Sequence, residues 1–561
     1  MNADLFPTHR KINVWLPLLL SFVMTVGMWA GSRMNGNPPR VKVIKTMDTP
    51  PADLAATPEG IGRFEELIRY IDARYVEDLD REKLVSHAIG RVMDELDPHS
   101  AYFTESDLRE ANRQLEGGFY GIGIEYMTLD DTIVVLSVLP DGPAAAAGLL
   151  AGDKIVSLDD SLIIDQTVDN EGMLDYLRGE QGARVRVGIL RGAEPSPLTF
   201  VVERDFIAVN SVEAAYMLDA ETGYLRINRF STRTYEEFMK ALESLVERQG
   251  MKHLVLDLRR NGGGYLQEAT RILSQLFAEK DKLLVYTEGE RVPRNDYKST
   301  GHHFFDIGNI VLLTDEGSAS ASEIIAGALQ DWDRGVVIGR RTFGKGLVQE
   351  QYLLRDGSAV RLTVARYFTP AGRCIQRPYA DRDAYELDME DRIRSGEVYD
   401  GAKMLPADTT RYFTGNGRVV YGGGGIMPDI FIPLDSTAVN PHLLRLQEYI
   451  PAFLLRRQGA SPAEGMTLER FLSDYRPDAS LLADFRDYTR SRGDSCNERQ
   501  WRLLRPAITL QVKAALARQT WSDEGYFRAI NSQDPAIAKA LEVIRNPKPY
   551  LAPAATASTR Q

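Results

Sequence analysis

Three short apolar runs, each closely followed by glycines or serines, constrain the fold of this chain most strongly. They are HLVLDLR at 253–259, NIVLLTD at 309–315 and GVVIG at 335–339, and helical patterns separate them. Continuous apolar runs of this length are typical of strands buried in a sheet. Because strands that alternate with helices favour an α/β layer, we expect one between about residues 206 and 375.

The chain is too long for this layer to be its only folded unit. With 561 residues, three or four units are expected. A helical pattern begins at Ile61 and is broken by DPHS at 97–100, and from Gly117 short β-rich runs surround a small-residue helix and a Gly-Asp turn. The polar, irregular stretch 378–420 is interpreted as an insertion, and amphipathic helical runs return after about residue 436.

One apolar segment without charges lies near the start of the chain. Residues 14–31 read VWLPLLLSFVMTVGMWAG and follow His9, Arg10 and Lys11. The length is close to that of a short membrane-spanning helix, and positive residues stay on the cytoplasmic side. We therefore expect an anchor in the inner membrane, with the bulk of the chain on the periplasmic side of the cell envelope. A cleaved signal peptide is the alternative.

Charge and motif spacing argue against several classes of function. The formal net charge is −12, whereas a general nucleic-acid binder needs a basic face. The seven histidines show no metal-ligand spacing, so no metal is expected. GRRTFGKG at 339–346 is close to a phosphate-binding loop, but Gly346 stands where that pattern requires Ser or Thr, so no nucleotide is expected either.

A row of serines follows the second apolar run directly. GSASASEIIAGALQD at 317–331 places Ser318, Ser320 and Ser322 in the first turn of a predicted helix. Free backbone N–H groups and the helix dipole favour a developing oxyanion at this position, so a serine here is well placed as a nucleophile. Capping of the helix is the alternative use of these serines.

A serine nucleophile needs a base, and Lys345 in TFGKGLV is the best candidate near it. Burial among apolar residues and glycines would lower the pKa of the amine and let the neutral form accept the serine proton. Gln349, four residues on, could orient the amine. No histidine lies near either motif in the sequence, although the fold could bring in a distant one. An exposed lysine on a glycine turn is the alternative interpretation.

The glycines of DLRRNGGG at 257–264 supply a third element. Glycines allow a backbone to approach a ligand closely, so one of their N–H groups and the N–H group of Ala321 could form an oxyanion hole. A plain strand-to-helix turn is the alternative.

The order of these motifs resembles that in carboxyl-terminal processing proteases, the tail-specific peptidases with a Ser-Lys dyad. The matching stretches are DLRRNGGG, GSASASEIIAGALQD, GRRTFGKGLVQ, DGSAVRLTVARYFTPAGRCIQ and GGIMPDI, within a resemblance over roughly residues 62–435. It implies a serine endopeptidase with a ClpP/crotonase-like α/β core that forms an acyl-enzyme and needs no cofactor. GRCIQRPY and YGGGGIMPDI are similar to sequences of membrane-anchored relatives from the Bacteroidetes.

The resemblance also assigns roles to individual residues. The nucleophile would be Ser320, the general base Lys345 and the residue that orients the lysine Gln349. The oxyanion donors would be Ala321 and Gly263, with Gly264 as the alternative to Gly263, because NGGG stands where a proline often precedes the glycine pair.

The stretch from Gly117 resembles a PDZ domain through YGIGIEY and GPAAAAGLLAGDKIVSLDD. In such a domain an extended peptide adds to the edge of a sheet, and backbone N–H groups of a glycine-rich loop hold its terminal carboxylate. That loop would consist of Gly121, Ile122, Gly123 and Ile124. The implied partners are polypeptide substrates bound by their C-terminal tails. A catalytically silent binding protein is the alternative, although it would be free to lose Ser320, Lys345 or Gln349.

The predicted architecture is therefore multidomain, α/β and α+β. Its parts are a cytoplasmic start with an anchor or signal segment (1–31), a linker (32–60), an N-terminal helical segment (61–110), a PDZ-like domain (117–205), a protease core with its insertion (206–435), a C-terminal helical region (436–545) and a disordered tail (546–561). The C-terminal helices either cover the core or form a partner or homo-oligomer surface.

Overall fold

The computed structural model describes residues 59–553, apart from short gaps at 130–131, 160, 163–172, 174–175, 193, 195, 438–439, 458–461 and 464. The predicted membrane segment 14–31 lies outside the described residues. Among those that are described, no helix combines the length and apolar character needed to cross a bilayer.

The predicted α/β layer is confirmed as a six-stranded sheet. Its strands, in spatial order, are β10 (Val212–Met217), β11 (Thr222–Ile227), β12 (His253–Asp257), β15 (Ile310–Thr314), β16 (Val336–Gly339) and β21 (Ile430–Phe431). β10 runs antiparallel to β11, and the remaining pairs are parallel. The three apolar runs of the sequence are thus the adjacent central strands β12, β15 and β16.

Both faces of this sheet are covered, which explains why its central strands β12, β15 and β16 are mostly apolar. The covering helices are α7 (Thr234–Glu243), α8 (Leu266–Leu276) and α9 (Ala321–Asp331) on one face and α16 (Pro535–Arg545) on the other. Leu254 and Leu256 of β12 pack in the cluster with α7, α8 and α9, whereas Val255 between them packs in the cluster with α16. Successive strand residues point to opposite faces, so each face needs its own apolar set.

A second sheet brings the N-terminal segment next to the core. Its members are β1 (Ala101–Phe103), β18 (Ala359–Phe368), β13 (Lys280–Glu288) and β14 (Asn295–Thr300), with β17 (Leu347–Leu353) also paired to β18. The antiparallel pairing of β1 with β18 joins Tyr102 to Val360, across more than 250 residues of sequence. The turn before β1 is therefore fixed beside the β17–β18 hairpin.

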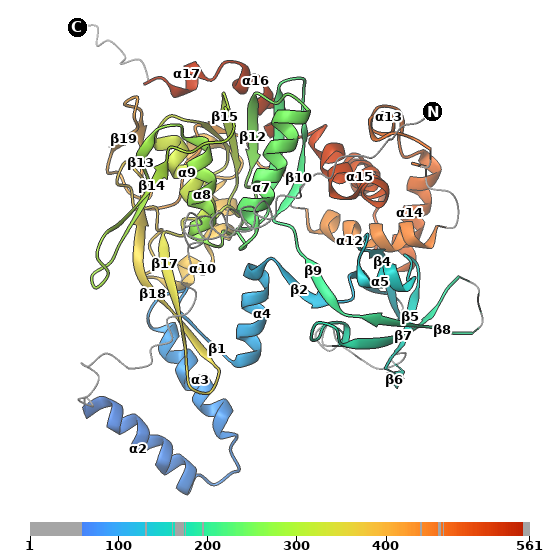
Figure 1. The fold of residues 1–561 in the computed structure, drawn as a ribbon, viewed down its shortest axis with the longest axis horizontal. Helices are drawn as coiled ribbons and strands as arrows, with labels where there is room; N and C mark the ends of the chain where they lie inside the picture. The colour runs from blue at the N-terminus through green and yellow to red at the C-terminus, as the bar shows by residue number, and fades with distance from the viewer. Residues whose placement is uncertain are drawn as a thin grey trace, which may run out of the picture.

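The PDZ-like domain forms a separate sheet, drawn in teal in Figure 1. Its strands are β3 (Ile124–Leu129), β4 (Thr132–Val138), β5 (Lys154–Leu158), β7 (Arg184–Leu190) and β8 (Leu198–Glu203), with β6 (Ser161–Leu162) paired to β5. The helix α5 (Pro143–Ala147) lies in this domain, and β2 (Gly118–Gly121) pairs with β9 (Asp205–Ala208) where the chain enters and leaves it. β3 is an edge strand that follows the predicted carboxylate loop.

The remaining elements are mostly helical (Figure 1). They are α2 (Glu59–Arg74), α3 (Arg81–Asp94) and α4 (Glu105–Glu116) before the PDZ-like domain, the π-helical turn η2 (Ser244–Arg248) after α7, α10 (Arg382–Glu386), α11 (Asp388–Ser395), η3 (Gly401–Lys403), β19 (Tyr412–Phe413) and β20 (Val419–Val420) in the insertion, and α12 (Pro441–Arg456), α13 (Leu468–Asp474), α14 (Ala479–Ser491), α15 (Glu498–Asn531) and α17 (Lys548–Leu551) toward the C-terminus. Helices α12 to α15 share an apolar core of their own.

A buried ion pair fixes the far end of α9 and provides the first testable prediction. The side chains of Asp331 and Arg373 are each 1% exposed, and they pair with one another. Because Asp331→Ala leaves the buried guanidinium without its carboxylate, we expect the free energy of unfolding to fall by about 3–5 kcal/mol. Urea denaturation followed by circular dichroism measures this change. Glu236→Ala, which breaks the exposed pair with Lys240, is the matched control and should leave the midpoint unchanged; equal midpoints for both variants would contradict the prediction.

Candidate active site

Ser320 lies at the turn that joins β15 to α9. It is the N-cap residue of α9, and its backbone has φ 55° and ψ −112°. A non-glycine residue rarely adopts such a conformation, at a cost of about 1–3 kcal/mol, and the surrounding structure must hold it there. The neighbouring serines supply part of that support: Ser318 Oγ donates to the Leu258 carbonyl at 2.8 Å, and Ser322 Oγ donates to the Asn261 carbonyl at 2.9 Å. These two hydroxyls are fully buried, whereas Ser320 is partly exposed.

Lys345 lies on the loop between β16 and β17. Its Nζ donates to Gln349 Oε1 at 3.0 Å, and Gln349 Nε2 donates in turn to the His99 carbonyl. Burial lowers the pKa of the Lys345 amine, and the nearby positive charge of Arg361 lowers it further. The structure thus brings the side chains of Lys345 and Gln349 together, and their catalytic roles stay predictions.

The backbones of Ser320 and Lys345 are anchored on one carboxylate oxygen. Both N–H groups donate to Glu323 Oε2, each at 2.8 Å, so the two nitrogens can be no farther apart than twice that distance. Tyr367 Oη lies within hydrogen-bond distance of the Ser320 and Lys345 carbonyls as well. Among the described residues no hydrogen bond joins Ser320 Oγ to Lys345 Nζ, and catalytic hydrogen bonds are often long before substrate binds.

Glu323 is the residue of this site that the sequence reasoning missed. It is fully buried, and its other oxygen accepts from Thr342 Oγ1 at 2.5 Å and from the Gly344 N–H at 2.7 Å. Burial raises the pKa of Glu323 to about 7, and the four donors oppose this rise. The signal for it was available, because Ser320 and Glu323 have the spacing of a capping box.

The glycine turn packs directly against Ser320. Gly263 has φ +99°, and a Cβ atom there would lie 2.7 Å from Ser320 Cβ and 3.0 Å from the Ala321 nitrogen. Only glycine therefore fits this position without a shift. The Gly263 N–H donates to Asn261 Oδ1 at 2.9 Å, so it would have to share or release this bond to serve an oxyanion. Gly263 and Gly264 both stay predictions as the second donor, beside Ala321 at the first position of α9.

A distant histidine does reach the site. His99 belongs to the turn before β1, where Asp97 accepts the His99 N–H at 2.8 Å and the Ser100 N–H at 2.9 Å. Its Nε2 shares a hydrogen bond of 2.6 Å with Tyr385 Oη of the insertion. Burial and the positive charge of Lys345 lower the pKa of His99 to about 4, so the imidazole is neutral at physiological pH. Its backbone carbonyl, and not its ring, is the group that supports Gln349.

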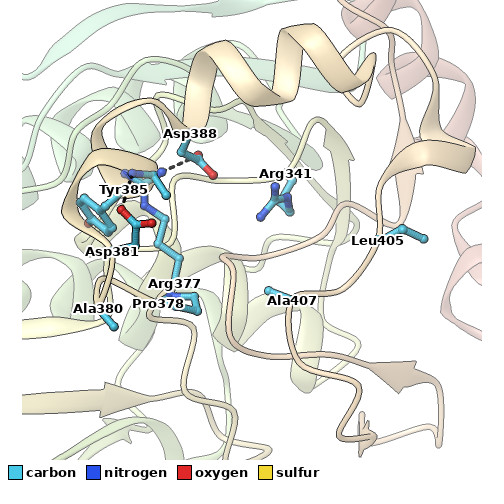
Figure 2. A pocket seen from close by; sticks show the side chains of 10 residues that line it. Arg341, Arg377, Pro378, Ala380, Asp381, Tyr385, Asp388, Leu405 and Ala407 are labelled. Carbon is cyan, nitrogen blue, oxygen red and sulfur yellow. Dashed lines mark hydrogen bonds and ion pairs between the residues drawn. The ribbon is translucent and has the colours of Figure 1, made fainter.

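A pocket of about 390 Å³ opens beside the lysine loop (Figure 2). Arg341, Arg377, Asp381, Tyr385 and Asp388 line it, so both signs of charge are present. The Arg377 guanidinium lies 3.8 Å from the centre of the Tyr385 ring and pairs with Asp388. Both arginines are already paired, Arg341 with Glu397 and Arg377 with Asp388, so this lining favours no particular class of ligand. No cluster of three His, Cys, Asp or Glu side chains within the described ranges could hold a metal ion.

The predicted peptide loop lies at the start of the open edge of the PDZ-like sheet. Gly121 ends β2, Ile124 begins β3, and Gly123 between them has φ +77°. The carbonyls of Ile122 and Gly123 are held by the N–H groups of Ala144 and Leu139, at 2.8 and 2.9 Å. Two carbonyls of the loop are thus fixed by the rest of the domain, and β3 is paired with a strand on one side only, with β4.

Glu323→Gln tests whether the shared carboxylate holds this site together. The amide would turn its NH₂ group toward two of the four donors, and each buried donor left without an acceptor costs about 1–3 kcal/mol. We expect the free energy of unfolding to fall by that amount for each lost bond, as measured by urea denaturation. The same substitution at the exposed Glu247 of η2 is the control. Unchanged stability of the Glu323→Gln variant would show that the four contacts do not bear on folding.

Comparison with known proteins places these motifs in a family. The model of Peptidase family S41 matches residues 221–385, and a PDZ domain model matches residues 121–202. Residues 445–523 match a family of unknown function.

Individual relatives agree with the family models. The Carboxy-terminal-processing protease of Bartonella bacilliformis is 37% identical over 322 residues, which cover 56% of this chain and 72% of that protein. The Carboxy-terminal processing protease CtpB of Bacillus subtilis is 34% identical, over 57% of this chain and 66% of that protein. The solved structure of a photosystem II D1 C-terminal processing protease is 33% identical, covers 56% of this chain and 83% of that chain, and superposes with a TM-score of 0.33. The chain therefore belongs to the carboxy-terminal processing proteases of peptidase family S41, serine-type peptidases with a PDZ domain.

Proposed function

We propose that this protein cleaves peptide bonds in polypeptides that it binds by their C-terminal tails, with Ser320 as the nucleophile and Lys345 as the general base. The observation that carries the proposal is the common anchoring of the two residues: both backbone N–H groups donate to Glu323 Oε2 at 2.8 Å. A buried amine with a lowered pKa beside a serine at a helix N-terminus is the combination that Ser-Lys catalysis requires.

Acylation then follows from these positions. The neutral Lys345 amine takes the proton of Ser320 Oγ while the oxygen attacks the carbonyl carbon of the substrate. The Ala321 N–H and an N–H of the glycine turn stabilise the negative oxygen that develops. The ammonium of Lys345 returns the proton to the leaving amine as the C–N bond breaks, and Ser320 is left as an ester.

Deacylation repeats the proton transfers with water. Lys345 takes a proton from the water that attacks the ester, and it returns this proton to Ser320 Oγ as the C–O bond of the ester breaks. The product leaves as a carboxylic acid and then loses its remaining proton to water. Gln349 keeps the amine aimed at Ser320 throughout, because its own Nε2 is fixed to the His99 carbonyl.

The substrate class is proposed from the PDZ-like domain. Its edge strand β3 can accept an extended peptide, and the loop Gly121–Ile124 would hold the terminal carboxylate. A polypeptide with a flexible C-terminus meets both requirements. The relatives named above process carboxy-termini according to their names, which agrees with this choice.

We also propose that residues 14–31 anchor the protein in the inner membrane, with the protease on the periplasmic side. The support is the absence of charge in this segment and the basic residues before it.

Two substitutions test the dyad. Ser320→Ala removes the nucleophile and Lys345→Met removes the base while keeping the length of the side chain, so degradation of an unfolded protein with an apolar C-terminus should fall by about 10²–10⁴-fold or more. Binding of the tail, measured by fluorescence anisotropy, should be unchanged in both variants. Lys240→Met, at an exposed lysine of α7, is the control. Wild-type cleavage rates in Ser320→Ala would end the proposal, whereas tail binding without cleavage in the wild type would indicate a silent binding protein.

The pH dependence of kcat/KM tests the state of Lys345. Only the neutral amine accepts a proton, so activity should rise with pH through the lowered pKa of Lys345 and be lost as the pH falls. Because the charge of Arg361 contributes to that lowering, Arg361→Gln should move the limb to higher pH. Arg355→Gln, at the exposed tip of the β17–β18 hairpin, should leave the position of this limb unchanged. A flat profile from about pH 6 to 9 in the wild type would argue against a titrating lysine base.

A further inference from the structure

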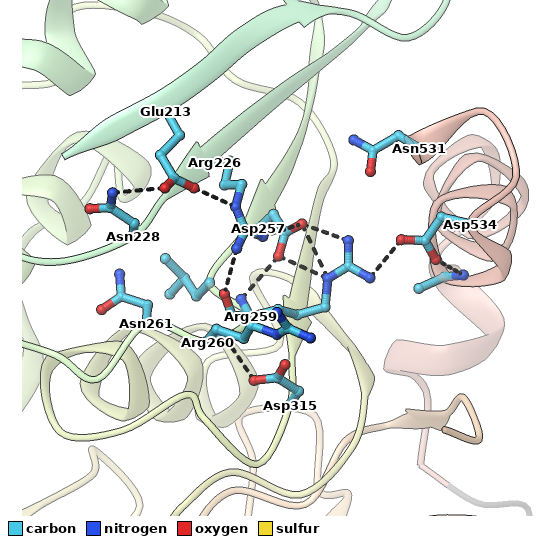
Figure 3. Close-up of polar contacts among 12 residues, drawn as sticks. Glu213, Arg226, Asn228, Asp257, Arg259, Arg260, Asn261, Asp315, Asn531 and Asp534 are labelled. Atoms are coloured by element: carbon cyan, nitrogen blue, oxygen red, sulfur yellow. Dashed lines mark hydrogen bonds and ion pairs between the residues drawn. The ribbon is translucent and has the colours of Figure 1, made fainter. Parts of the chain in front are cut away.

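The C-terminal helices contribute a carboxylate to a buried charge cluster next to the glycine turn (Figure 3). Asp534 lies between α15 and α16, and its Oδ2 accepts from Arg259 Nη1 at 2.6 Å. The two side chains are only 13% and 20% exposed. The family model ends at residue 385, so this contact joins the matched core to a part of the chain outside it.

Two carboxylates pair with the Arg259 guanidinium, and Asp534 is the partner of its Nη1 group. Its Nη2 donates to Asp257 Oδ2 at 2.7 Å, and Asp257 is fully buried and also pairs with Arg226 at 3.2 Å. Arg226 has Glu213 as a second partner, at 2.7 Å. Among the described residues Asp534 is the acceptor of Nη1, so its loss would leave that group of a largely buried cation unpaired. Such a loss is costly in a protein interior.

Arg259 opens the turn that carries the oxyanion glycines. Its carbonyl accepts from Arg226 Nη2 at 3.1 Å, and the next residue, Arg260, has a positive φ of 61°. Asn261 follows, and its carbonyl accepts the Ala319 N–H at 2.9 Å, immediately before Ser320. Asn261 Oδ1 holds the Gly263 N–H. The strained backbone conformation of Arg260 is kept only if the residues on either side are fixed, and Arg259 is the residue before it.

We propose that Asp534 is a positioning residue for catalysis. By fixing Arg259, it keeps the turn 259–263 at the correct position relative to Ser320, the proposed nucleophile. The C-terminal region then helps to position the active site, in addition to covering one face of the sheet. This inference rests on the proposed function, because the turn matters for rate only if an oxyanion forms beside it.

A purely structural role for Asp534, as the cap of α16, can be separated from its pairing with Arg259. Asp534 is also the N-cap of α16, where it accepts the Ala536 N–H at 2.8 Å, and α16 packs on the sheet through Ile537 and Ala540. Asn is as good an N-cap as Asp, so Asp534→Asn keeps the cap and removes the charge that Arg259 requires. Asp219→Asn is the matched control, because Asp219 pairs with Arg545 of the same helix at 3.3 Å but does not touch the glycine turn.

The experiment compares these full-length variants on a peptide that mimics a substrate tail. We expect Asp534→Asn to lower kcat about tenfold per folded molecule while KM changes less than about twofold, because an interaction that acts only in the transition state affects kcat. A peptide aldehyde, whose adduct with Ser320 carries an oxyanion, should bind more weakly by a similar factor, and Asp534→Glu should recover most of the loss. Asp219→Asn should behave as the wild type in each assay.

A double-mutant cycle with Arg259→Lys supplies a second criterion. If Asp534 acts through Arg259, the double variant should be no slower than Arg259→Lys alone. Additive losses, an unchanged kcat in folded Asp534→Asn, or an equal loss in Asp219→Asn would each overturn the inference. Ser320→Ala serves as the reference: if it remained active, the proposed function itself would fail, whereas an inactive Ser320→Ala beside a fully active Asp534→Asn would remove only the role of Asp534.

Discussion

The active site depends on one buried carboxylate. Glu323 accepts four hydrogen bonds, two from the backbones of Ser320 and Lys345 and two from Thr342 and Gly344 of the lysine loop. Each of these buried donors would cost about 1–3 kcal/mol if it were left without an acceptor, and burial keeps water from replacing the carboxylate. The free energy of these four bonds exceeds the cost of the backbone strain at Ser320. The bonds also fix the distance between the turn after β15 and the loop after β16.

Remote parts of the chain support the segments that carry Ser320 and Lys345. The turn Asp97–Ser100 is placed by the pairing of β1 with β18, and it presents the His99 carbonyl to Gln349. The insertion contributes Tyr385, which holds the other end of His99, and the C-terminal helices contribute Asp534 to the glycine turn. Among the described residues no carboxylate pairs with Lys345 Nζ, and such a partner would raise the pKa of the amine and leave less of it neutral at physiological pH.

The parts of the site that could be predicted are those with local signals. Ser320 follows a buried strand and opens a helix, and Gln349 follows Lys345 by four residues in a segment that becomes strand β17. The second oxyanion donor is harder to predict, because the Gly263 N–H is engaged by the side chain of Asn261, and sequence spacing does not reveal where an asparagine side chain points. The contacts of His99 and Asp534 also had no local signal, since each joins a residue more than 200 positions away.

The sequence by itself determined the buried strands, the helix that Ser320 caps, the PDZ-like domain and the family, because periodicity, helix-end chemistry and motif order are properties of neighbouring residues. Only the tertiary structure decided which carboxylate joins the dyad, which carbonyl holds Gln349 and which helix completes the cluster around Arg259. The physical reason is that a buried polar group must find its partners among whatever groups packing brings within about 3 Å, and here packing draws them from the two ends and the middle of the chain.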